Sequence, residues 1–388
     1  MRLGFFTNNY APWVGGVTTA VETLREGLER RGHEVFIFAP SFSGDTGGTP
    51  RVIRYRSIPA LTYPEFVLPI PFSLAISRVI RRLDLDLFHA HHPFLLGRTA
   101  LRLARRAGRP LVFTYHTRYE KYAHYVPFPL SWVQKTAVAR ATRFANQADL
   151  VIAPSIAARA LLQAQGVRTR IEVVPTGIPP ARIGPGPRWA LRADLGFSDS
   201  ARLVLSVGRL DPEKNLPTLL RAFDSAAQPR PEFHLLMVGK GTQEGHLRAL
   251  ASSLPSASQI HFLGAIDYEK VLDIYRAADL FLFASTTETQ GLVVAEALAV
   301  GLPVVALRAP GVEELARDGV TGVLADSEAD LGQALAVLLN DDGRRAALAR
   351  AALETAPDLS AELQVDRLAR FYEELLAAGS KREERRWQ

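Results

Sequence analysis

The chain contains 388 residues, of which 47% are hydrophobic and 22% are charged, as in a globular protein of about two domains. It has no cysteine, which excludes disulfides, zinc–thiolate sites and cysteine nucleophiles. Its longest apolar runs fall short of the roughly 18 residues of a membrane-spanning helix, and the run at the N-terminus is too short for a signal-peptide core.

The net charge of +6 is unevenly divided along the chain. Residues 1–180 carry 23 Lys and Arg against 11 Asp and Glu, a net charge of +12, whereas residues 181–388 carry 23 against 29, a net charge of −6. This asymmetry indicates that the first half faces an anionic partner. A membrane surface, a nucleic acid and a phosphorylated substrate are the candidates.

Short apolar runs alternate with longer amphipathic stretches through the first half. We expect buried strands at residues 3–7, 35–39, 87–90, 111–115 and 150–154, and helices at 18–31 and 95–107. Gly32 is well placed to end the first of these helices. The alternation predicts an α/β domain with a parallel sheet.

A Pro- and Gly-rich segment at 178–187 marks a linker, and a second series of elements follows it. Strands are expected at 203–207, 234–238, 260–263, 280–283, 303–306 and 322–324, with helices at 216–226, 268–277 and 291–300. The predicted fold class is α/β, with two doubly wound Rossmann-like domains facing each other across a cleft. The expected boundaries are 1–178, a linker at 179–190, 191–365, and a C-terminal helix at 366–388 that returns toward the first domain.

Glycines or cations follow the first strand of each predicted domain. Gly15 and Gly16 lie between a strand and a helix, where the backbone can approach an anionic ligand, although a tight turn explains them equally well. They do not form the GxGxxG fingerprint, so a nicotinamide cofactor is not indicated. Arg209 and Lys214 stand at the carboxyl end of a strand, where two fixed cations suit a diphosphate. A solvated charged loop is the alternative.

Two carboxylates flank the start of the expected helix at 291–300. Glu288 precedes this helix, and Glu296 lies inside it among apolar residues, where a carboxylate needs partners. Sugar and ribose hydroxyls are natural partners, and a pair of structural carboxylates capped by backbone is the alternative. Gly291 allows the helix N-terminus to offer N–H groups to a phosphate.

Together these segments resemble glycosyltransferase family 4, a family of retaining transferases with the two-domain GT-B fold. The resemblance covers nearly the whole chain through ordered motifs: Gly15-Gly16, Gly32-His33-Glu34-Val35, Ala148-Asp149 with Pro154-Ser155, Val174-Pro175-Thr176-Gly177-Ile178, Gly208-Arg209 with Lys214-Asn215, and Glu288 with Glu296 after seven residues.

The resemblance implies a site for a nucleotide-diphosphate sugar, UDP-hexose, with no metal or other cofactor. Arg209 and Lys214 would hold the diphosphate, Glu288 would contact the transferred sugar, and Glu296 the ribose. Position 290 is often aromatic in relatives, so Gln290 departs from the pattern. The other expected donor-binding residues are Gly15, Gly16, Gly208, Gly264, Gln290, Gly291 and Leu292.

Two further patterns could suggest a metal. Asp84-Leu85-Asp86 lies just before a buried strand, which favours polarity at the entry of the strand over a metal site. His89, His91 and His92 follow, and strand alternation puts His89 and His91 on one face. We expect these histidines to line the active site.

Residues 114–125 are crowded with aromatic, basic and histidine side chains. They resemble the loop of diacylglycerol glucosyltransferases and related glycolipid synthases in the same family, which implies that His116 lies beside the transferred sugar. An aromatic cluster at the edge of the core is the alternative. Asn8 departs from these synthases, which usually carry an acidic residue there. The expected acceptor-binding residues are Asn8, Tyr10, His91, Tyr119, Tyr122 and His124.

Residues 66–83 alternate apolar side chains with Arg78, Arg81 and Arg82. The pattern predicts a basic amphipathic helix of the type that lies in a membrane interface, although an ordinary helix on the sheet has the same pattern. The charge of this half favours the membrane, because anionic lipid attracts basic segments. We therefore expect a cytoplasmic protein, peripherally bound to an anionic membrane surface at the inner face of the cell membrane, with no nucleic-acid partner.

These observations lead to the hypothesis of a retaining hexosyltransferase that moves a hexose from UDP-hexose to a membrane lipid such as 1,2-diacylglycerol. The alternatives are the same transfer to a soluble or phosphorylated acceptor, a nucleotide-sugar epimerase, and a non-enzymatic membrane or nucleic-acid binding protein. The last alternative leaves Glu288 and Glu296 unexplained.

Overall fold

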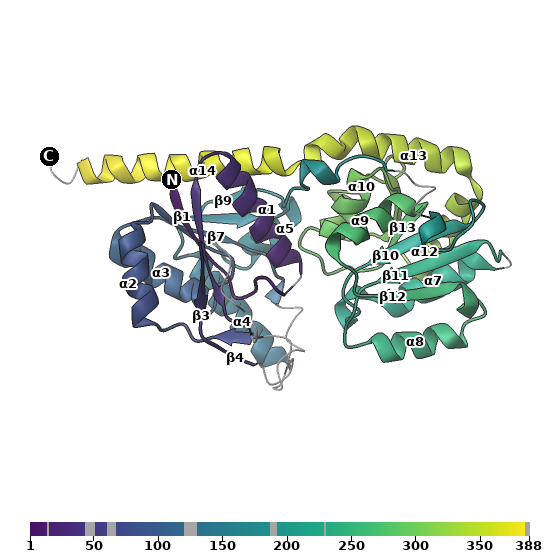
Figure 1. The fold of residues 1–388 in the computed structure, drawn as a ribbon, viewed down its shortest axis with the longest axis horizontal. Helices are drawn as coiled ribbons and strands as arrows, with labels where there is room; N and C mark the ends of the chain where they lie inside the picture. The colour runs from purple at the N-terminus through teal and green to yellow at the C-terminus, as the bar shows by residue number, and fades with distance from the viewer. Residues whose placement is uncertain are drawn as a thin grey trace. The chain divides into compact units, whose positions relative to one another are not determined.

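The computed structural model describes residues 1–13, 15–42, 51–59, 67–119, 130–186, 192–228 and 230–384. The chain divides into two compact units: Met1–Gly177 together with Ala361–Gln388, and Ile178–Ser360. Each unit is built around one parallel sheet with helices on both faces (Figure 1). This confirms the predicted α/β class. No described helix is both long enough and apolar enough to cross a bilayer.

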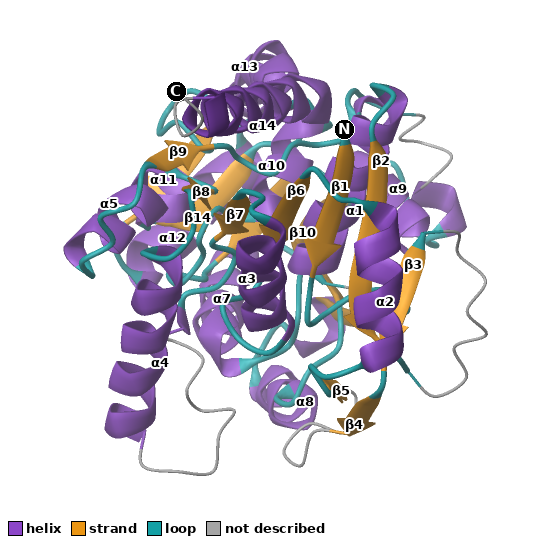
Figure 2. Ribbon diagram, turned by 90° about the vertical axis from the view of Figure 1, so that its left-hand side faces the viewer, coloured by secondary structure: helices purple, strands orange, loops and turns teal. Residues whose placement is uncertain are grey.

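The sheet of the first unit has the strand order β3-β2-β1-β6-β7-β8-β9. The order reverses between β1 and β6, and the strands lie side by side in Figure 2. A separate antiparallel hairpin joins β4 to β5. The strands are β1 (Arg2–Phe6), β2 (Glu34–Pro40), β3 (Val52–Tyr55), β4 (Ser57–Pro59), β5 (Val67–Pro69), β6 (Leu87–Ala90), β7 (Leu111–Thr114), β8 (Leu150–Ala153) and β9 (Ile171–Val173).

The helices of the first unit cover both faces of this sheet. They are α1 (Gly16–Arg30), α2 (Leu74–Leu83), α3 (Leu96–Ala107), α4 (Leu130–Ala145), α5 (Ile156–Ala164) and α14 (Ala361–Glu384). Gly32 adopts a φ of +80° just beyond the end of α1, as expected for a helix stop. On one face of the sheet, Phe6 stacks on Phe38 with ring centroids 4.4 Å apart.

The C-terminal helix α14 is part of the other face of the first unit. Val365, Leu368 and Tyr372 join the core formed by β1 and α1. A Cβ at Gly27 of α1 would lie 2.6 Å from the side chain of Val365, so the missing side chain of Gly27 is what lets the two helices approach. Arg31 adds an ion pair of 2.5 Å with Asp366.

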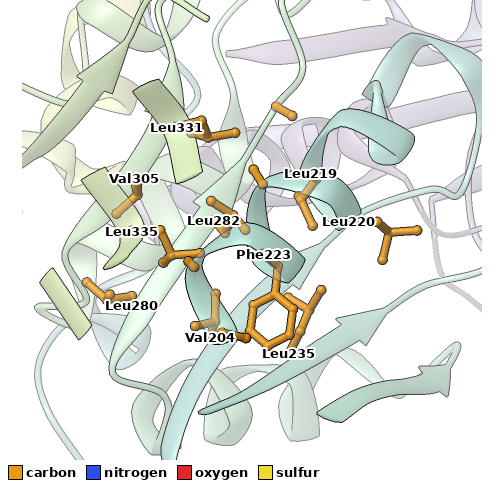
Figure 3. Close-up of a cluster of buried hydrophobic side chains, with 14 of the residues drawn as sticks. Val204, Leu219, Leu220, Phe223, Leu235, Leu280, Leu282, Val305, Leu331 and Leu335 are labelled. Atoms are coloured by element: carbon orange, nitrogen blue, oxygen red, sulfur yellow. The ribbon is translucent and has the colours of Figure 1, made fainter. Parts of the chain in front are cut away.

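The sheet of the second unit has the parallel order β12-β11-β10-β13-β14-β15. Figure 3 shows one of its core clusters, where Phe223 and Leu335 pack on strand residues such as Leu280. The main elements are β10 (Arg202–Val207), α7 (Leu216–Ala227), β11 (Phe233–Val238), α8 (Glu244–Ser253), β12 (Ile260–Gly264), α9 (Tyr268–Ala277), β13 (Leu280–Phe283), α10 (Leu292–Ala299), β14 (Val304–Leu307), α11 (Pro310–Glu313), β15 (Gly322–Ala325), α12 (Glu328–Asn340) and α13 (Asp342–Thr355).

The structure differs from the sequence-based expectations in several places, and strands β3, β4, β5 and β9 were not predicted. The helix expected in residues 66–83 covers only Leu74–Leu83, because residues 67–69 form β5 and Pro69 and Pro71 interrupt the run. Ile178, the last residue of the expected first domain, is buried against α10 and belongs to the second unit. Residues 361–365, placed in the second domain by the sequence, belong to α14 and to the first unit.

Candidate active site

Arg209 and Lys214 follow β10 in the second unit, where the sequence placed them. Gly208 precedes them with a φ of +152°, a backbone conformation that other residues rarely adopt. The Arg209 guanidinium donates a hydrogen bond of 2.5 Å to Asp211 and a second bond to Glu213. Arg209 is thereby held by two buried carboxylates, two and four residues further along the chain.

Glycines of a neighbouring loop bring it close to this turn. A Cβ at Gly239 would lie 1.9 Å from the carbonyl oxygen of Gly208, and one at Gly241 would lie 2.4 Å from the backbone of Leu210. The backbone N–H of Thr242 then donates to Asp211 at 2.9 Å. The loops after β10 and β11 therefore support each other, which fixes the carboxylate that holds Arg209.

Lys214 and Glu288 join the loop after β10 to the loop after β13. The Lys214 ammonium donates a hydrogen bond of 2.6 Å to Oε1 of Glu288. Burial by itself would raise the pKa of Glu288, but the charge and hydrogen bond of Lys214, a hydrogen bond from Ser285 and the charge of Arg209 together lower it. Glu288 is therefore held as a carboxylate within the field of both cations.

The backbone around Glu288 leads directly into α10. Gly291 is the N-cap of α10 and has a φ of +80°. A Cβ at Gly311 would lie 2.8 Å from the carbonyl oxygen of Glu288, so α11 packs closely under this loop. Gln290 is buried, Leu292 is the first residue of α10, and Gly264 ends β12 with a φ of +73°. The N–H groups at the start of α10 thus follow the loop that carries Glu288.

Glu296 lies inside α10 and is buried, as predicted. Its Oε2 accepts a hydrogen bond of 3.0 Å from the hydroxyl of Tyr275 on α9. Both residues line a small pocket together with Ile178 and Arg182. Sequence reasoning did not identify Tyr275, although a tyrosine on the buried face of an otherwise apolar helix needs a partner for its hydroxyl.

A cluster of buried histidines lies in the first unit. His89 and His91 face the same way at the end of β6, with ring centroids 4.2 Å apart, which confirms the prediction from strand alternation. Nδ1 of His91 lies 2.9 Å from Nε2 of His116, beyond the end of β7. Burial lowers the pKa of His89 to about 3 and that of His92 to about 4, and it lowers the pKa of His91 and His116 as well.

Asn8 and Tyr10 serve structural contacts in this unit. The Asn8 side chain accepts from the N–H of Leu96 and donates to the carbonyl oxygen of Phe94, so it caps the start of α3. Tyr10 is 2% exposed, and its hydroxyl donates to Glu22. Tyr10 is therefore too buried for the acceptor contact that the sequence led us to expect. The side-chain amide of Asn8 is bonded to the backbone at the start of α3.

The remaining donor- and acceptor-binding residues expected in the first unit lie in different parts of the chain. Tyr119 packs edge-on against Phe94, and its buried hydroxyl has no hydrogen-bond partner in the described part of the chain. Gly15 is the N-cap of α1, and Gly16 is the first residue of that helix. Tyr122 and His124 lie outside the described residues.

Arg78, Arg81 and Arg82 are exposed on α2, while Ile80 of the same helix is buried. Asp86 accepts a hydrogen bond of 2.7 Å from the N–H of Arg2, in keeping with a role at the entry of β6. Within the described ranges, no group of three His, Cys, Asp or Glu residues is arranged to hold a metal ion.

Comparison with known proteins identifies the family. Residues 14–182 match Glycosyltransferase Family 4, and residues 187–355 match Glycosyl transferases group 1. The chain is 33% identical over 382 residues to an alpha-monoglucosyldiacylglycerol synthase of Streptococcus pneumoniae, and the matched region covers 96% of this chain and 85% of the relative. The chain belongs to glycosyltransferase family 4. This glycosyltransferase is therefore an enzyme, and the alternative of a non-enzymatic binding protein is removed.

Further relatives of this glycosyltransferase carry different names. An alpha-monoglucosyldiacylglycerol synthase of Acholeplasma laidlawii is 31% identical over 85% of this chain and 86% of the relative. A GDP-mannose-dependent alpha-mannosyltransferase of Mycobacterium tuberculosis is 31% identical over 90% of this chain and 91% of the relative. The family is thus common to these relatives, whereas the named donors and acceptors differ.

Solved structures confirm the GT-B fold of this glycosyltransferase. Anabaena Alr3699/HepE in complex with UDP and glucose superimposes with a TM-score of 0.79 at 22% identity, covering 96% of this chain and all of the other. Sucrose-phosphate synthase from Thermosynechococcus elongatus gives a TM-score of 0.83 at 24% identity, covering 97% and 99%.

Proposed function

We propose that this glycosyltransferase moves a hexose from UDP-hexose to a membrane lipid such as 1,2-diacylglycerol, with retention of configuration. The observation that carries the proposal is the cluster formed by Arg209, Lys214 and Glu288 at the carboxyl ends of β10 and β13. Ligands of such sheets bind at this end of the strands. Two cations held by carboxylates are suited to a diphosphate whose negative charge grows as the sugar–phosphate bond breaks.

The proposed step is a front-face displacement. The acceptor hydroxyl oxygen forms a bond to the anomeric carbon while the bond from that carbon to the diphosphate breaks. The hydroxyl proton passes to the leaving phosphate oxygen, and Arg209, Lys214 and the N–H groups at the start of α10 stabilise the leaving group. Glu288 would orient the transferred sugar, Glu296 would bind the ribose, and His116 would lie beside the sugar.

The same cations make a metal ion unnecessary in the proposed step. A divalent ion would stabilise the diphosphate through its positive charge, and Arg209 and Lys214 supply that charge from fixed positions. Transfer should therefore persist after exhaustive treatment with EDTA. Loss of transfer with EDTA and its return on adding Mg²⁺ or Mn²⁺ would contradict this part of the proposal.

The lipid acceptor is supported first by the relatives named alpha-monoglucosyldiacylglycerol synthase. It is supported independently by apolar side chains that remain exposed near the basic helix α2. Phe72 is 71% exposed and Leu74 is 79% exposed. Exposed apolar residues of this kind next to arginines are typical of a surface that enters a lipid headgroup region. The exposed apolar residues of this part of the chain are Ile58, Leu68, Ile70, Phe72, Leu74 and Val79, and the exposed arginines of α2 are Arg78, Arg81 and Arg82.

The substrate proposal is tested by a screen of UDP- and GDP-sugars against vesicles of diacylglycerol and anionic phospholipid, with the linkage of the product determined. We expect an α-linked glycosyl diacylglycerol from UDP-glucose or another UDP-hexose. The Glu288→Ala variant should be folded and inactive. Transfer only to a soluble acceptor would overturn the lipid assignment. Inositol phosphate is the soluble acceptor to include, because one relative named D-inositol 3-phosphate glycosyltransferase is 30% identical over 94% of this chain.

Peripheral binding at the inner face of the membrane is tested separately by flotation with anionic and neutral vesicles. The wild-type protein should float with anionic vesicles. A triple change of Arg78, Arg81 and Arg82 to Gln should weaken flotation, since each basic residue near the surface contributes about 1 kcal/mol of attraction. A Leu74→Ser variant should weaken it on both vesicle types by reducing apolar burial. A wild-type protein that does not float contradicts the membrane assignment.

A further inference from the structure

The C-terminal helix carries a tyrosine into the histidine cluster of the first unit. The hydroxyl oxygen of Tyr372 lies 2.6 Å from Nδ1 of His89, although the two residues are 283 positions apart in the chain. The ring of Tyr372 is fully buried with Val365 and Leu368 of the same helix. The helix therefore holds the Tyr372 hydroxyl in one place.

Both ring nitrogens of His89 are engaged. Nε2 lies 2.7 Å from the hydroxyl oxygen of Thr114, at the end of the neighbouring strand β7. A neutral imidazole has one donor and one acceptor nitrogen, and the two hydroxyls can serve either role. The His89 ring cannot turn over without losing or distorting both hydrogen bonds, so Tyr372 and Thr114 together fix its plane.

The fixed ring of His89 supports the next histidine. His91 stacks on it with an interplanar angle of 29°, and Phe5 contacts both rings at centroid distances of 5.0 Å. His91 then reaches His116 through the contact of 2.9 Å between Nδ1 and Nε2. A rigid series of contacts therefore runs from Tyr372 on α14 through His89 and His91 to His116.

The last contact in this series also indicates a protonation pattern. Nε2 of His91 is buried and has no hydrogen-bond partner in the part of the chain that the structure describes. If His116 donated to His91, this buried nitrogen would carry an unpaired N–H, and such groups are rare in folded proteins. Donation from Nδ1–H of His91 to His116 avoids that cost. His116 then keeps its own proton on Nδ1.

We propose that Tyr372 is a positioning residue that holds the ring of His116 in place through His89 and His91. The proposal deepens the proposed function and rests on it, since His116 lies beside the transferred sugar in that function. Neutral imidazoles suit this arrangement, and burial keeps the pKa of each of these histidines below its ordinary value. The C-terminal helix would thus contribute to the site without touching the substrate.

The test compares Tyr372→Phe and Thr114→Val with Tyr55→Phe. Each of the first two variants removes one hydroxyl that holds His89 and keeps the shape of the side chain. Tyr55 is an equally buried tyrosine on β3, an edge strand of the same sheet, so its variant is a matched control for the loss of a buried hydroxyl. Thr114→Val also serves as the second route if Tyr372→Phe fails to fold.

The first readout is nuclear magnetic resonance of the ring nitrogens in protein labelled with ¹⁵N-histidine. In the wild type we expect His116 to be protonated on Nδ1 and unprotonated on Nε2. The ring signals of His91 and His116 should shift or broaden in Tyr372→Phe and Thr114→Val and remain unchanged in Tyr55→Phe. If the signals in Tyr372→Phe match those of the control, the proposal is overturned.

The second readout is steady-state kinetics with UDP-hexose and diacylglycerol vesicles. Loss of the hydrogen bond between Tyr372 and His89 should lower kcat roughly five- to tenfold, the equivalent of about one neutral hydrogen bond, with the donor KM unchanged. A Tyr372→Phe enzyme with the kcat of Tyr55→Phe contradicts the proposal. A wild-type protein that transfers no hexose contradicts the proposed function instead, and the histidine spectra still decide the role of Tyr372.

Discussion

The ammonium group of Lys214 lies 2.6 Å from Oε1 of Glu288, and the two side chains are only 16% and 17% exposed. The pair joins loops that are 74 residues apart in the chain. It holds a cation and an anion side by side at the place where the proposed donor would carry both a diphosphate and a sugar. The ion pair therefore orients the ammonium group, whose proposed partner is the diphosphate, and the carboxylate, whose proposed partner is the transferred sugar.

Replacing Lys214 by Met should lower kcat/KM by about 10²–10³-fold, the usual effect of removing one charged or hydrogen-bonding group that stabilises a leaving oxyanion. It should also destabilise the second unit, because Glu288 is left buried without its main cationic partner. The double variant Lys214→Met, Glu288→Gln should recover part of that stability but no activity. Kinetics and urea unfolding measure the two effects.

The matched control for this prediction is Lys270→Met, which removes an exposed lysine from α9 of the same unit. It should leave both transfer and unfolding unchanged. If Lys214→Met retains full kcat/KM while Glu288→Gln loses it, the ammonium group has no role in stabilising the diphosphate.

Tyr275→Phe should weaken the binding of UDP without changing the fold. The variant removes the hydroxyl that donates to Glu296 at 3.0 Å, and the carboxylate then loses one of the groups that orient it toward the proposed ribose. We expect Kd for UDP to rise roughly fivefold, the equivalent of about 1 kcal/mol. Isothermal titration calorimetry on the full chain measures it.

The control for the Tyr275→Phe variant is a modified ligand. Uridine diphosphate that lacks the 2′- and 3′-hydroxyls cannot bond to Glu296 through its ribose, so wild type and Tyr275→Phe should bind it equally. An equal loss with both ligands would show that Tyr275 acts through general packing, in which case Glu296 does not read the ribose by way of this tyrosine.

The central strands of both sheets and the cations after β10 could be predicted from the sequence because they depend on local patterns, whereas the short strands β3, β4, β5 and β9 were not predicted. Fully buried parallel strands such as β8 and β13 read as continuous apolar runs, and Arg209 and Lys214 come soon after the strand β10. The helix predicted at 66–83 is too long, because the apolar run also includes the residues of β5. Pro69 and Pro71 cannot continue a helix, and both precede its actual start at Leu74.

The contacts made by the buried tyrosines could not be predicted. Tyr372 and His89 are 283 residues apart, and nothing in the residues around either one indicates the other. The resemblance to the glycolipid synthases places Asn8 among the expected acceptor-binding residues, but nothing in the sequence indicates that its amide caps α3 from 88 residues away. Pairings of this kind depend on the relative placement of elements in the folded unit, which local periodicity does not contain.

Breaking the buried ion pair between Arg192 and Asp279 should strongly destabilise the second unit. The Arg192 side chain is 1% exposed and also donates to the carbonyl oxygens of Ala277 and Ala201, at 2.9 and 2.8 Å. Asp279→Asn keeps the shape but leaves the guanidinium without its countercharge. We expect a loss of about 3–5 kcal/mol in the free energy of unfolding.

The control for Asp279→Asn is a variant of an exposed ion pair, that between Arg221 and Glu328. Glu328→Gln should cost less than about 1 kcal/mol, because exposed pairs are screened by water. Urea unfolding followed by fluorescence and circular dichroism gives both values. Equal costs for the two variants would mean that the Arg192 pair is no better protected from solvent than the surface pair.

Acidification should unfold the first unit because of its buried histidines. Burial lowers the pKa of His89 to about 3 and that of His92 to about 4, and His91 and His116 are lowered too. The unfolded chain, with histidine pKa values near 6.5, binds more protons than the folded chain below that pH. Stability is therefore fully present above about pH 6.5 and is lost as the pH falls, by up to about 1.4 kcal/mol per pH unit for each such histidine.

The measurement is the free energy of unfolding from urea titrations between pH 7.5 and pH 5. Its slope should be near zero at the upper end and strongly positive with pH below about 6. His92→Asn should reduce that slope by the contribution of one histidine, because the asparagine side chain can still accept from the N–H of Asn8 but does not titrate. A wild-type stability that stays constant down to pH 5 would show that these histidines become protonated without unfolding the unit, and the neutral contact between His91 and His116 would then not persist at acid pH.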